Sequence, residues 1–327
     1  MHHSTVPRLA LIAFALLACG QREDTPKKSE PRPGSGGSSV EAIVADDPWA
    51  KAPAGPTSVA EQACPRVTSA YFYRIEKDGK TSHLLGTRHI GVAWRKMPSV
   101  VHDAMRDSKL VVFETLEDDD APPRSHRPAR DELGPVLWQR YQTLMGEDLA
   151  EKMADESPAT AMLFLMIQFE DRFSFLEKEI GSEAQRTHKP IRALETGEFQ
   201  EKLLAKVLDT RAVKAFLEHV DSIDELKQET IEDLTEYCSG TDETPGMDAE
   251  DRAELVESGY TNAEIDAQEK ELLSDRNRDW IPKLGPILAE GGAFIAVGAD
   301  HLRGDEGVPA LLVAKGYRVT RLTPPSP

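Results

Sequence analysis

The sequence is poor in basic residues, in cysteine and in long apolar runs. Its 327 residues hold 39 Lys and Arg against 57 Asp and Glu, a formal net charge of −18. Non-specific binding to nucleic acid needs a basic surface that displaces counterions from phosphates, so this balance excludes that class of protein. The 3 cysteines are too few for a disulfide-built scaffold or a four-thiolate zinc site. A hydrophobic content of 39% with 29% charged residues indicates a soluble core and excludes a polytopic membrane protein.

The N-terminus has the pattern of a bacterial export signal. Arg8 precedes an uncharged run, residues 9–17, which is too short to cross about 30 Å of hydrocarbon. The run leads into the sequence LLAC, which resembles a lipobox whose cysteine, Cys19, takes a diacylglyceryl group. We therefore predict a signal peptide over residues 1–18 and a lipid anchor on Cys19; the alternative is a plain secretory signal with a chance cysteine. Gly20 after the cysteine favours, by resemblance to known lipoproteins, the outer membrane facing the periplasm.

The segment after Cys19 has the composition of a tether. Residues 19–63 contain the stretches KKSEPRPGSGGSS and PWAKAPAGP and show no apolar periodicity. Pro, Gly and Ser at this density give a flexible linker, which would hold a globular domain away from the bilayer. Residues 324–327 are expected to form a short tail. The globular domain is therefore predicted over residues 64–323.

The globular domain shows strand patterns at both ends and helical patterns between them. Strand-like residues 70–75 and 83–86 flank Asp78-Gly79, a pair favoured in tight hairpin turns. Further strands are predicted at 110–113, 293–297 and 317–322, and helices from Pro98 and over 158–178, 196–208, 216–234 and 308–315. These patterns predict an α/β fold. Two related strand-GxxH-helix half-units form a central mixed sheet, with a large, mainly helical insertion at about 133–285.

The motif Gly-x-x-His occurs twice, each time directly after an apolar strand. The first copy is Gly86 to His89 and the second is Gly298 to His301. In open α/β sheets ligands bind beyond the carboxyl ends of the strands, where both histidines are expected. One such histidine alone is more often a turn or capping residue. The pair suggests two half-units that face a shared cleft.

A third candidate is Glu114, at the end of the apolar strand 110–113. A carboxylate at such a place must be solvated, paired or bound to metal, because burying it alone is unfavourable. Two imidazoles and one carboxylate make a set suited to a divalent ion with an open position for water. We therefore predict His89, His301 and Glu114 as metal ligands.

The layout resembles the TraB/GumN family, relatives of the Tiki proteases, from about Tyr71 to Leu322. The resemblance is carried by LLGTRHIG (84–91), KLVVFETL (109–116), RALETGEFQ (192–200), SDRNRDW (274–280) and FIAVGADHLRGDEGVPALLVAKGYRV (294–319). The last piece is the most specific, because motif, spacing and the following helix and strand all match. The family implies an exported or cell-surface protein with a metal-dependent hydrolase site.

The resemblance also implies further site residues. Glu195 matches the acid of the family's Leu-Glu-Thr segment, and Arg276 and Asn277 match an Arg-Asn pair on a late helix. The chain departs from the family at Glu177, which is one methylene longer than the aspartate of many relatives. The two motifs also differ in charge, because Arg88 precedes His89 whereas Asp300 precedes His301.

These residues suggest a mechanism in which a divalent ion (Mn, Co or Zn) lowers the pKa of a bound water. Glu114 or Glu195 would be a ligand or the general base, and Arg276 would bind a substrate carbonyl, carboxylate or oxyanion; the alternative for Arg276 is a surface ion pair. The leading hypothesis is a lipid-anchored, metal-dependent hydrolase of peptide or amide bonds, with a peptide or protein substrate. The alternatives are a non-catalytic lipoprotein that binds metal, haem or a signal peptide, and a degenerate envelope scaffold.

The cysteine count leaves one pair. If Cys19 carries lipid, Cys64 and Cys238 remain, and an exported protein permits a disulfide between them. The alternative is two separate thiols. No HExxH, GxSxG, Walker A or GxGxxG sequence is present, so the sequence does not match those hydrolase and nucleotide-binding classes.

Overall fold

The structure is a computed structural model, and it describes residues 59–116, 126–170, 174–241, 246–247 and 249–323. The predicted signal peptide, the predicted lipid anchor at Cys19, nearly all of the linker and the tail at 324–327 lie outside the described residues. Among the helices of the described part, none is both long and apolar enough to span a bilayer.

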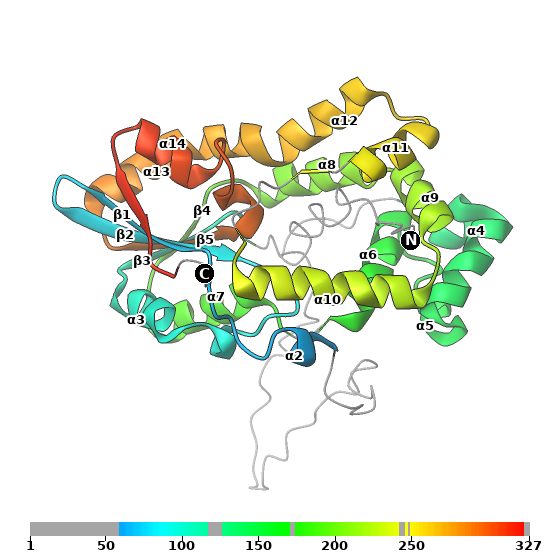
Figure 1. Cartoon of the computed structure of the whole chain (residues 1–327), viewed down its shortest axis with the longest axis horizontal. Helices are drawn as coiled ribbons and strands as arrows, with labels where there is room; N and C mark the ends of the chain where they lie inside the picture. Colours follow the sequence, from blue (N-terminus) through cyan, green and yellow to red (C-terminus); the bar gives the residue numbers. More distant parts are fainter. Residues whose placement is uncertain (1–58, 117–125, 171–173, 242–245, 248, 324–327) are drawn as a thin grey trace, which may run out of the picture.

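A six-stranded mixed sheet lies at one end of the molecule (Figure 1). Its spatial order is β4-β3-β5-β2-β1-β6. The neighbours β4, β3, β5 and β2 are parallel, whereas β1 is antiparallel to both β2 and β6. The predicted α/β fold with a mixed sheet is confirmed. The strands are β1 (Phe72–Lys77), β2 (Lys80–Thr87), β3 (Leu110–Phe113), β4 (Ile191–Ala193), β5 (Ala293–Gly298) and β6 (Arg318–Arg321).

The two strands that carry the Gly-x-x-His motifs are direct neighbours. β2 and β5 pair in parallel with Leu84 opposite Ile295 and Thr87 opposite Gly298. Every residue of β5 is buried, because helices cover both faces of the sheet, and this explains its continuous apolar sequence. Parallel pairing brings the two motifs to the same edge of the sheet.

The predicted hairpin joins β1 to β2. Asp78 and Gly79 form its turn with φ values of 49° and 72°, the left-handed conformations that a type I′ turn requires at both central positions. The resulting register pairs Phe72 with Leu85 and places Ile75 in the core. The short turn therefore fixes which face of β2 is buried.

Two layers of helix enclose the sheet, as Figure 1 shows. Helices α3 (Ser99–Asp107) and α7 (Leu176–Arg186) lie on one side, and α13 (Asp275–Glu290) and α14 (Val308–Ala314) lie on the other. Apolar residues of all four helices join those of the strands in one hydrophobic core. This packing leaves the carboxyl ends of the parallel strands facing the rest of the chain.

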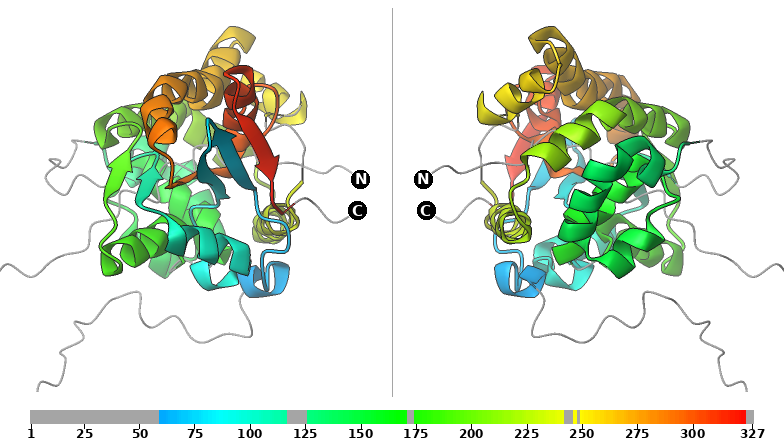
Figure 2. Two further views of the ribbon diagram at one scale, coloured as in Figure 1. Left: turned by 90° about the vertical axis from the view of Figure 1, so that its left-hand side faces the viewer. Right: turned by 90° about the vertical axis from the view of Figure 1, so that its right-hand side faces the viewer.

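Most of the remaining helices form a second lobe with a hydrophobic core of its own (Figures 1 and 2). Long helices connect the lobes, since α10 packs on α2 beside the sheet and α12 continues through a π-helical turn, η3, into α13. The elements outside the sheet layers are α2 (Val59–Ala63), η1 (Trp94–Lys96), α4 (Ala129–Met145), α5 (Glu147–Lys152), α6 (Pro158–Met166), η2 (Ile167–Phe169), α8 (Gly197–Val207), α9 (Thr210–His219), α10 (Ile223–Ser239), α11 (Ala249–Glu257), α12 (Asn262–Glu269), η3 (Lys270–Ser274) and η4 (Ala299–Leu302).

Two of the predicted helices were wrong, because each predicted run contains parts of two separate helices. The run 158–178 breaks after α6, and Phe175 forms a β-bridge with Ile90 before α7 begins. The run 216–234 breaks between α9 and α10, where Ser222 caps α10 by accepting a hydrogen bond from Glu225 N. The extended conformation at Phe175 comes from pairing with a residue distant in the sequence, whereas the break before α10 comes from a local helix cap. The predicted insertion at about 133–285 also contains a strand of the sheet, β4.

Cys64 and Cys238 form a disulfide with Cα atoms 5.9 Å apart. The bond joins the segment after α2 to the last turn of α10. Thr68 reinforces the connection, because its N–H and its hydroxyl both donate to Cys238 O. The N-terminal end of the domain is thereby fixed to the long helix that runs between the lobes.

Candidate functional site

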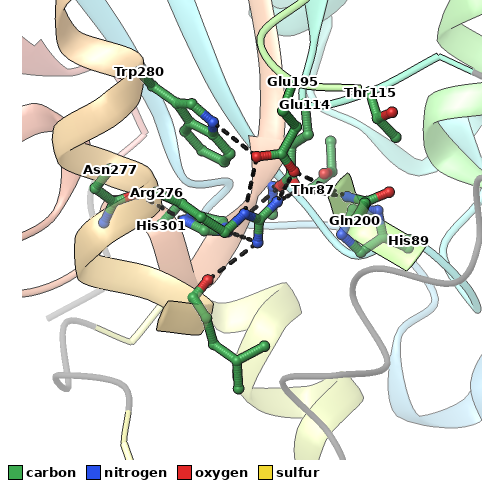
Figure 3. Close-up of polar contacts among 12 residues, drawn as sticks. Thr87, His89, Glu114, Thr115, Glu195, Gln200, Arg276, Asn277, Trp280 and His301 are labelled. Carbon is green, nitrogen blue, oxygen red and sulfur yellow. Dashed lines mark hydrogen bonds and ion pairs between the residues drawn. The ribbon is translucent and has the colours of Figure 1, made fainter. Parts of the chain in front are cut away.

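The candidate site lies beyond four adjacent strand ends (Figure 3). Glu114 directly follows β3, and Glu195 follows β4 by two residues. The motif histidines His89 and His301 follow β2 and β5. Backbone N–H groups of Leu194 and Glu195 bond to Glu114 O, which holds the two acidic residues side by side. The fold thus gathers residues that are far apart in the sequence at one edge of the sheet.

Glu114 is the most enclosed carboxylate of this edge. Its Oε1 accepts a 2.6 Å hydrogen bond from Gly298 N, and its Oε2 accepts from Arg276 Nη2 at 2.5 Å and Gln200 Nε2 at 3.3 Å. Burial raises the pKa of this carboxyl, but the charge of Arg276, the two histidines and the Gly298 bond outweigh it and lower the pKa to about 2. Glu114 is therefore ionised at neutral pH.

Glu195 is held in a fixed orientation by α13. Arg276 Nε donates to its Oε2 at 3.1 Å and Arg276 Nη2 donates to its Oε1, a bidentate pair. Trp280 Nε1 donates to the same Oε2 at 3.1 Å. Arg276 and Trp280 are one helical turn apart, so both reach Glu195 from one face of α13. Burial raises the pKa of Glu195 against the opposing effect of Arg276.

Arg276 is the centre of the cluster. Its guanidinium is 2% exposed. Besides its bonds to Glu114 and Glu195, its Nη1 donates to Leu272 O at 3.1 Å and to His301 Nε2 at 3.0 Å. A guanidinium has five N–H donors, and these contacts use all five. Arg276 was predicted to bind substrate; in this arrangement it has no donor left for one, and it positions the side chains around it.

His301 is locked at both ring nitrogens. Its Nδ1 donates to Asn277 Oδ1 at 2.7 Å, and its Nε2 accepts from Arg276. Asn277 is oriented in turn, because its Nδ2 donates to Glu306 O at 2.9 Å. The Trp280 ring lies 4.4 Å from the imidazole. Burial, with the Arg276 charge, lowers the pKa of His301 to about 3, so the ring is neutral with its proton on Nδ1.

His89 has the opposite environment. Its Nδ1 lies 2.7 Å from Glu177 Oε1, and Thr87 Oγ1 donates to the same oxygen. The carboxylate favours a proton on Nδ1, which leaves the lone pair on Nε2. That Nε2 is buried and has no hydrogen-bond partner among the described residues. Burial lowers the pKa of His89, but the charge and hydrogen bonding of Glu177 outweigh it and raise the pKa overall.

The segment before α7 brings Glu177 to His89. Gly91 N bonds to Ser174 O and Leu176 N bonds to His89 O, so residues 174–176 run alongside residues 89–91. The sequence analysis marked Glu177 only as a departure from its family, and Gln200, which donates to both Glu114 and Glu195, was not predicted. Gln200 could have been found, since it ends the segment RALETGEFQ.

The motif glycines make room for the cluster. A Cβ on Gly298 would stand 3.2 Å from Glu114 Oε1, 3.3 Å from His89 Nε2 and 3.6 Å from His301 Cδ2. A Cβ on Gly86 would stand 2.7 Å from Tyr71 Cβ, and Gly86 O accepts from Tyr237 OH at 2.9 Å. The motif residues Arg88 and Asp300 pair instead with Glu170 and Arg303.

Two of the three predicted metal ligands, His301 and Glu114, are engaged by the Arg276 guanidinium in this arrangement. His301 Nε2 lies 3.7 Å from Glu114 Oε1, but its lone pair accepts the Arg276 hydrogen bond. Glu114 Oε2 accepts from the same guanidinium. Across the described ranges, no three His, Cys, Asp or Glu side chains have a geometry that could hold a metal ion. A cationic side chain stands where the predicted ligands His301 and Glu114 converge.

Comparison with known proteins assigns the chain. Searches against curated proteins and against solved structures found no match. The model of the TraB/PrgY/gumN family matches residues 71–321, which span the whole sheet and every residue of the cluster. The chain therefore belongs to the TraB/PrgY/gumN family.

Proposed function

We propose that this protein is a hydrolase of peptide or other amide bonds, held at the bacterial envelope by lipid on Cys19. The observation that carries the proposal is His89, a buried imidazole with Glu177 Oε1 2.7 Å from Nδ1 and, among the described residues, no hydrogen-bond partner at Nε2. A carboxylate this close to Nδ1 favours the tautomer that leaves Nε2 available as a general base. Family membership supports an enzymatic role and leaves the reaction to be tested.

The proposed attacking water lies between His89 Nε2 and Glu114 Oε1. These two atoms flank the position that a Cβ on Gly298 would take, at 3.3 and 3.2 Å from it, so a side chain at Gly298 would crowd both. His89 Nε2 takes a proton as the water oxygen adds to the carbonyl carbon. The imidazolium then returns that proton to the leaving nitrogen as the carbon–nitrogen bond breaks. Glu177 stabilises the imidazolium between these two transfers.

The other residues hold this pair of acceptors in place. Glu114, ionised and bonded to Gly298 N, remains an acceptor throughout the cycle. Arg276 balances the charges of Glu114 and Glu195 and fixes the ring of His301. Such preorganisation keeps the reacting groups from reorienting as charge develops. No step is assigned to a metal ion, because two of the three predicted ligands, His301 and Glu114, are bonded to Arg276.

A peptide library tests the activity. The full chain, purified in detergent, is incubated with the library and the products are read by mass spectrometry. We expect cleavage that His89→Ala abolishes and that His188→Asn retains. His188 is an exposed histidine with φ 55°, a conformation that asparagine also adopts, so it is a matched control. Saturable peptide binding without products would support the alternative, a binding protein.

The anchor is tested separately. Lipid on Cys19 predicts that the mature chain begins at that residue with a diacylglyceryl mass and fractionates with membranes. Cys19→Ser should release the protein into the aqueous fraction. A mature N-terminus at any other residue would contradict the anchor and leave the hydrolase proposal untouched.

A further inference from the structure

The cluster contains a permanent cation. The Arg276 guanidinium is enclosed by two carboxylates, a backbone carbonyl and an imidazole nitrogen, all within hydrogen-bonding distance. These acceptors, two carboxylates and an imidazole Nε2, are the atom types that coordinate Zn²⁺, Co²⁺ or Mn²⁺. The guanidinium therefore meets a set of groups that would otherwise suit a divalent ion.

The backbone of α13 keeps the guanidinium in this place. The π-helical turn η3 directly precedes α13, whose second residue is Arg276, and contains Leu272, whose carbonyl accepts from Arg276 Nη1. Insertions of this kind are frequent at functional sites because they redirect a side chain. The arginine is also packed against the Trp280 ring, with its Cζ 4.9 Å from the ring centroid. If the guanidinium left the cluster, five hydrogen bonds would break and two buried carboxylates, Glu114 and Glu195, would lose their cationic partner.

A divalent ion and the guanidinium cannot share these acceptors. The lone pair of His301 Nε2 is directed at Arg276, and Asn277 holds the only proton of the ring on Nδ1, so the ring cannot turn to offer another nitrogen. An ion bound to Glu114 and His301 would also stand next to a buried positive charge. Within a desolvated site that repulsion is strong.

We infer that Arg276 takes the place of a metal ion in this protein, so that the wild-type cluster binds no divalent cation and acquires a cation site only when the guanidinium is removed. The freed ligands are Glu114, Glu195 and His301, with His89 adjacent. The inference goes beyond the proposed hydrolysis, because it concerns metal binding and is measured without any substrate.

Cobalt titration tests the inference. The full chain in detergent is stripped with chelator, and Co²⁺ is added while the visible absorption of the ion and the bound metal per chain are measured. We expect no site-bound Co²⁺ in the wild type and one equivalent in Arg276→Met, lost again in Arg276→Met/His301→Ala. Arg278→Met is the matched control, because Arg278 lies on the same helix and is half-exposed, with partners Asp275 and Glu306.

Two results would overturn the inference. One is a wild-type protein that binds one equivalent of Co²⁺ and loses it on His301→Ala. The other is a folded Arg276→Met that binds none. Folding is checked by circular dichroism. If the single variant does not fold, Arg276→Met/Glu195→Gln replaces it in the titration. The double variant removes one buried negative charge together with the positive one. Loss of peptide cleavage in the first experiment would leave these metal measurements unaffected, so the two proposals fail separately.

Discussion

The two Gly-x-x-His motifs are alike in sequence and opposite in environment. Both follow neighbouring parallel strands, and both histidines are almost fully buried. His89 has a carboxylate at Nδ1 and an unbonded Nε2, whereas His301 has an amide oxygen at Nδ1 and a guanidinium at Nε2. Their pKa values move in opposite directions, up for His89 and down to about 3 for His301. The same local motif therefore presents a ring beside a carboxylate in one place and a ring held at both nitrogens in the other.

This difference shows that the partners decide the chemistry of the motif. Glu177 reaches His89 from the start of α7, and Arg276 and Asn277 reach His301 from α13. Neither partner is near its histidine in the sequence. A pair of similar half-units has thus become functionally asymmetric through the helices that pack against it.

The largest expected effect is the loss of the base. His89→Ala should lower kcat for peptide cleavage by about 10²–10⁴-fold, because a positioned general base contributes about that much. His301→Ala should lower the melting temperature instead, since it leaves Arg276 Nη1 without one acceptor. Steady-state kinetics and thermal unfolding on both variants measure the contrast. If His89→Ala and His301→Ala lost kcat equally and neither lost stability, the two histidines would not have different roles.

The next effect concerns the cation beside His301. Arg276→Met should lower the free energy of unfolding by about 3–5 kcal/mol, because it leaves two buried carboxylates without their partner. Arg278→Met, on the exposed side of the same helix, should change it by at most about 0.5 kcal/mol. Urea unfolding of the three proteins gives the comparison. A loss below about 1 kcal/mol for Arg276→Met would mean that the guanidinium does not hold the cluster together.

A smaller effect concerns Glu177, the carboxylate beside His89. Activity should rise with pH as His89 loses its proton, with a midpoint above the ordinary histidine value because the pKa of His89 is raised. Glu177→Gln removes the main charge that raises the pKa of His89 and should move this rise in activity to lower pH, with a lower kcat. The pH profile of kcat/KM for both proteins is the measurement. An unshifted profile would show that Glu177 does not act on the base.

The smallest effect is on stability in mild acid. His301 has a pKa of 6.5 when unfolded and about 3 when folded, so the unfolded chain binds the extra proton. Its contribution to stability is complete above pH 6.5 and is lost as pH falls toward 3, by at most about 1.4 kcal/mol per pH unit. His301→Asn should remove this part of the slope between pH 6.5 and 4.5. Parallel slopes in wild type and variant would exclude His301 as its source.

The sequence was sufficient for five strands of the sheet, but not for β4 or for the contacts between side chains at its edge. Apolar runs ending at Phe113 and Val297, and the Asp78-Gly79 turn, predict strands and a hairpin by local rules, and the structure agrees. The motif also indicated correctly that both histidines lie at one edge. The pairing of Glu177 with His89 depends on a β-bridge between residues 85 apart, and no local pattern encodes it.

The saturation of Arg276 was equally beyond the sequence. The local sequence around an arginine on an acidic helix is the same whether its side chain binds substrate, pairs with an exposed acid or lies in a buried cluster. What distinguishes these is which acceptors the fold brings to the guanidinium, here the carbonyl of Leu272 in η3 and the side chains of Glu114 and Glu195. The sequence indicated the ligand types of a metal site, but it did not indicate that a guanidinium would bond to two of them, Glu114 and His301.

The disulfide would have a mechanical consequence under the proposed lipid anchor at Cys19. Cys64 and Cys238 close a loop of chain with a sequence separation of 174 residues, which contains β1 to β4 and most of the second lobe. Tension that enters through the N-terminal segment passes at Cys64 across the covalent bond to α10, and the closed loop carries none of it. Strands β2 and β3, which present His89 and Glu114, are therefore shielded from a pull that would otherwise unzip the sheet from its first hairpin.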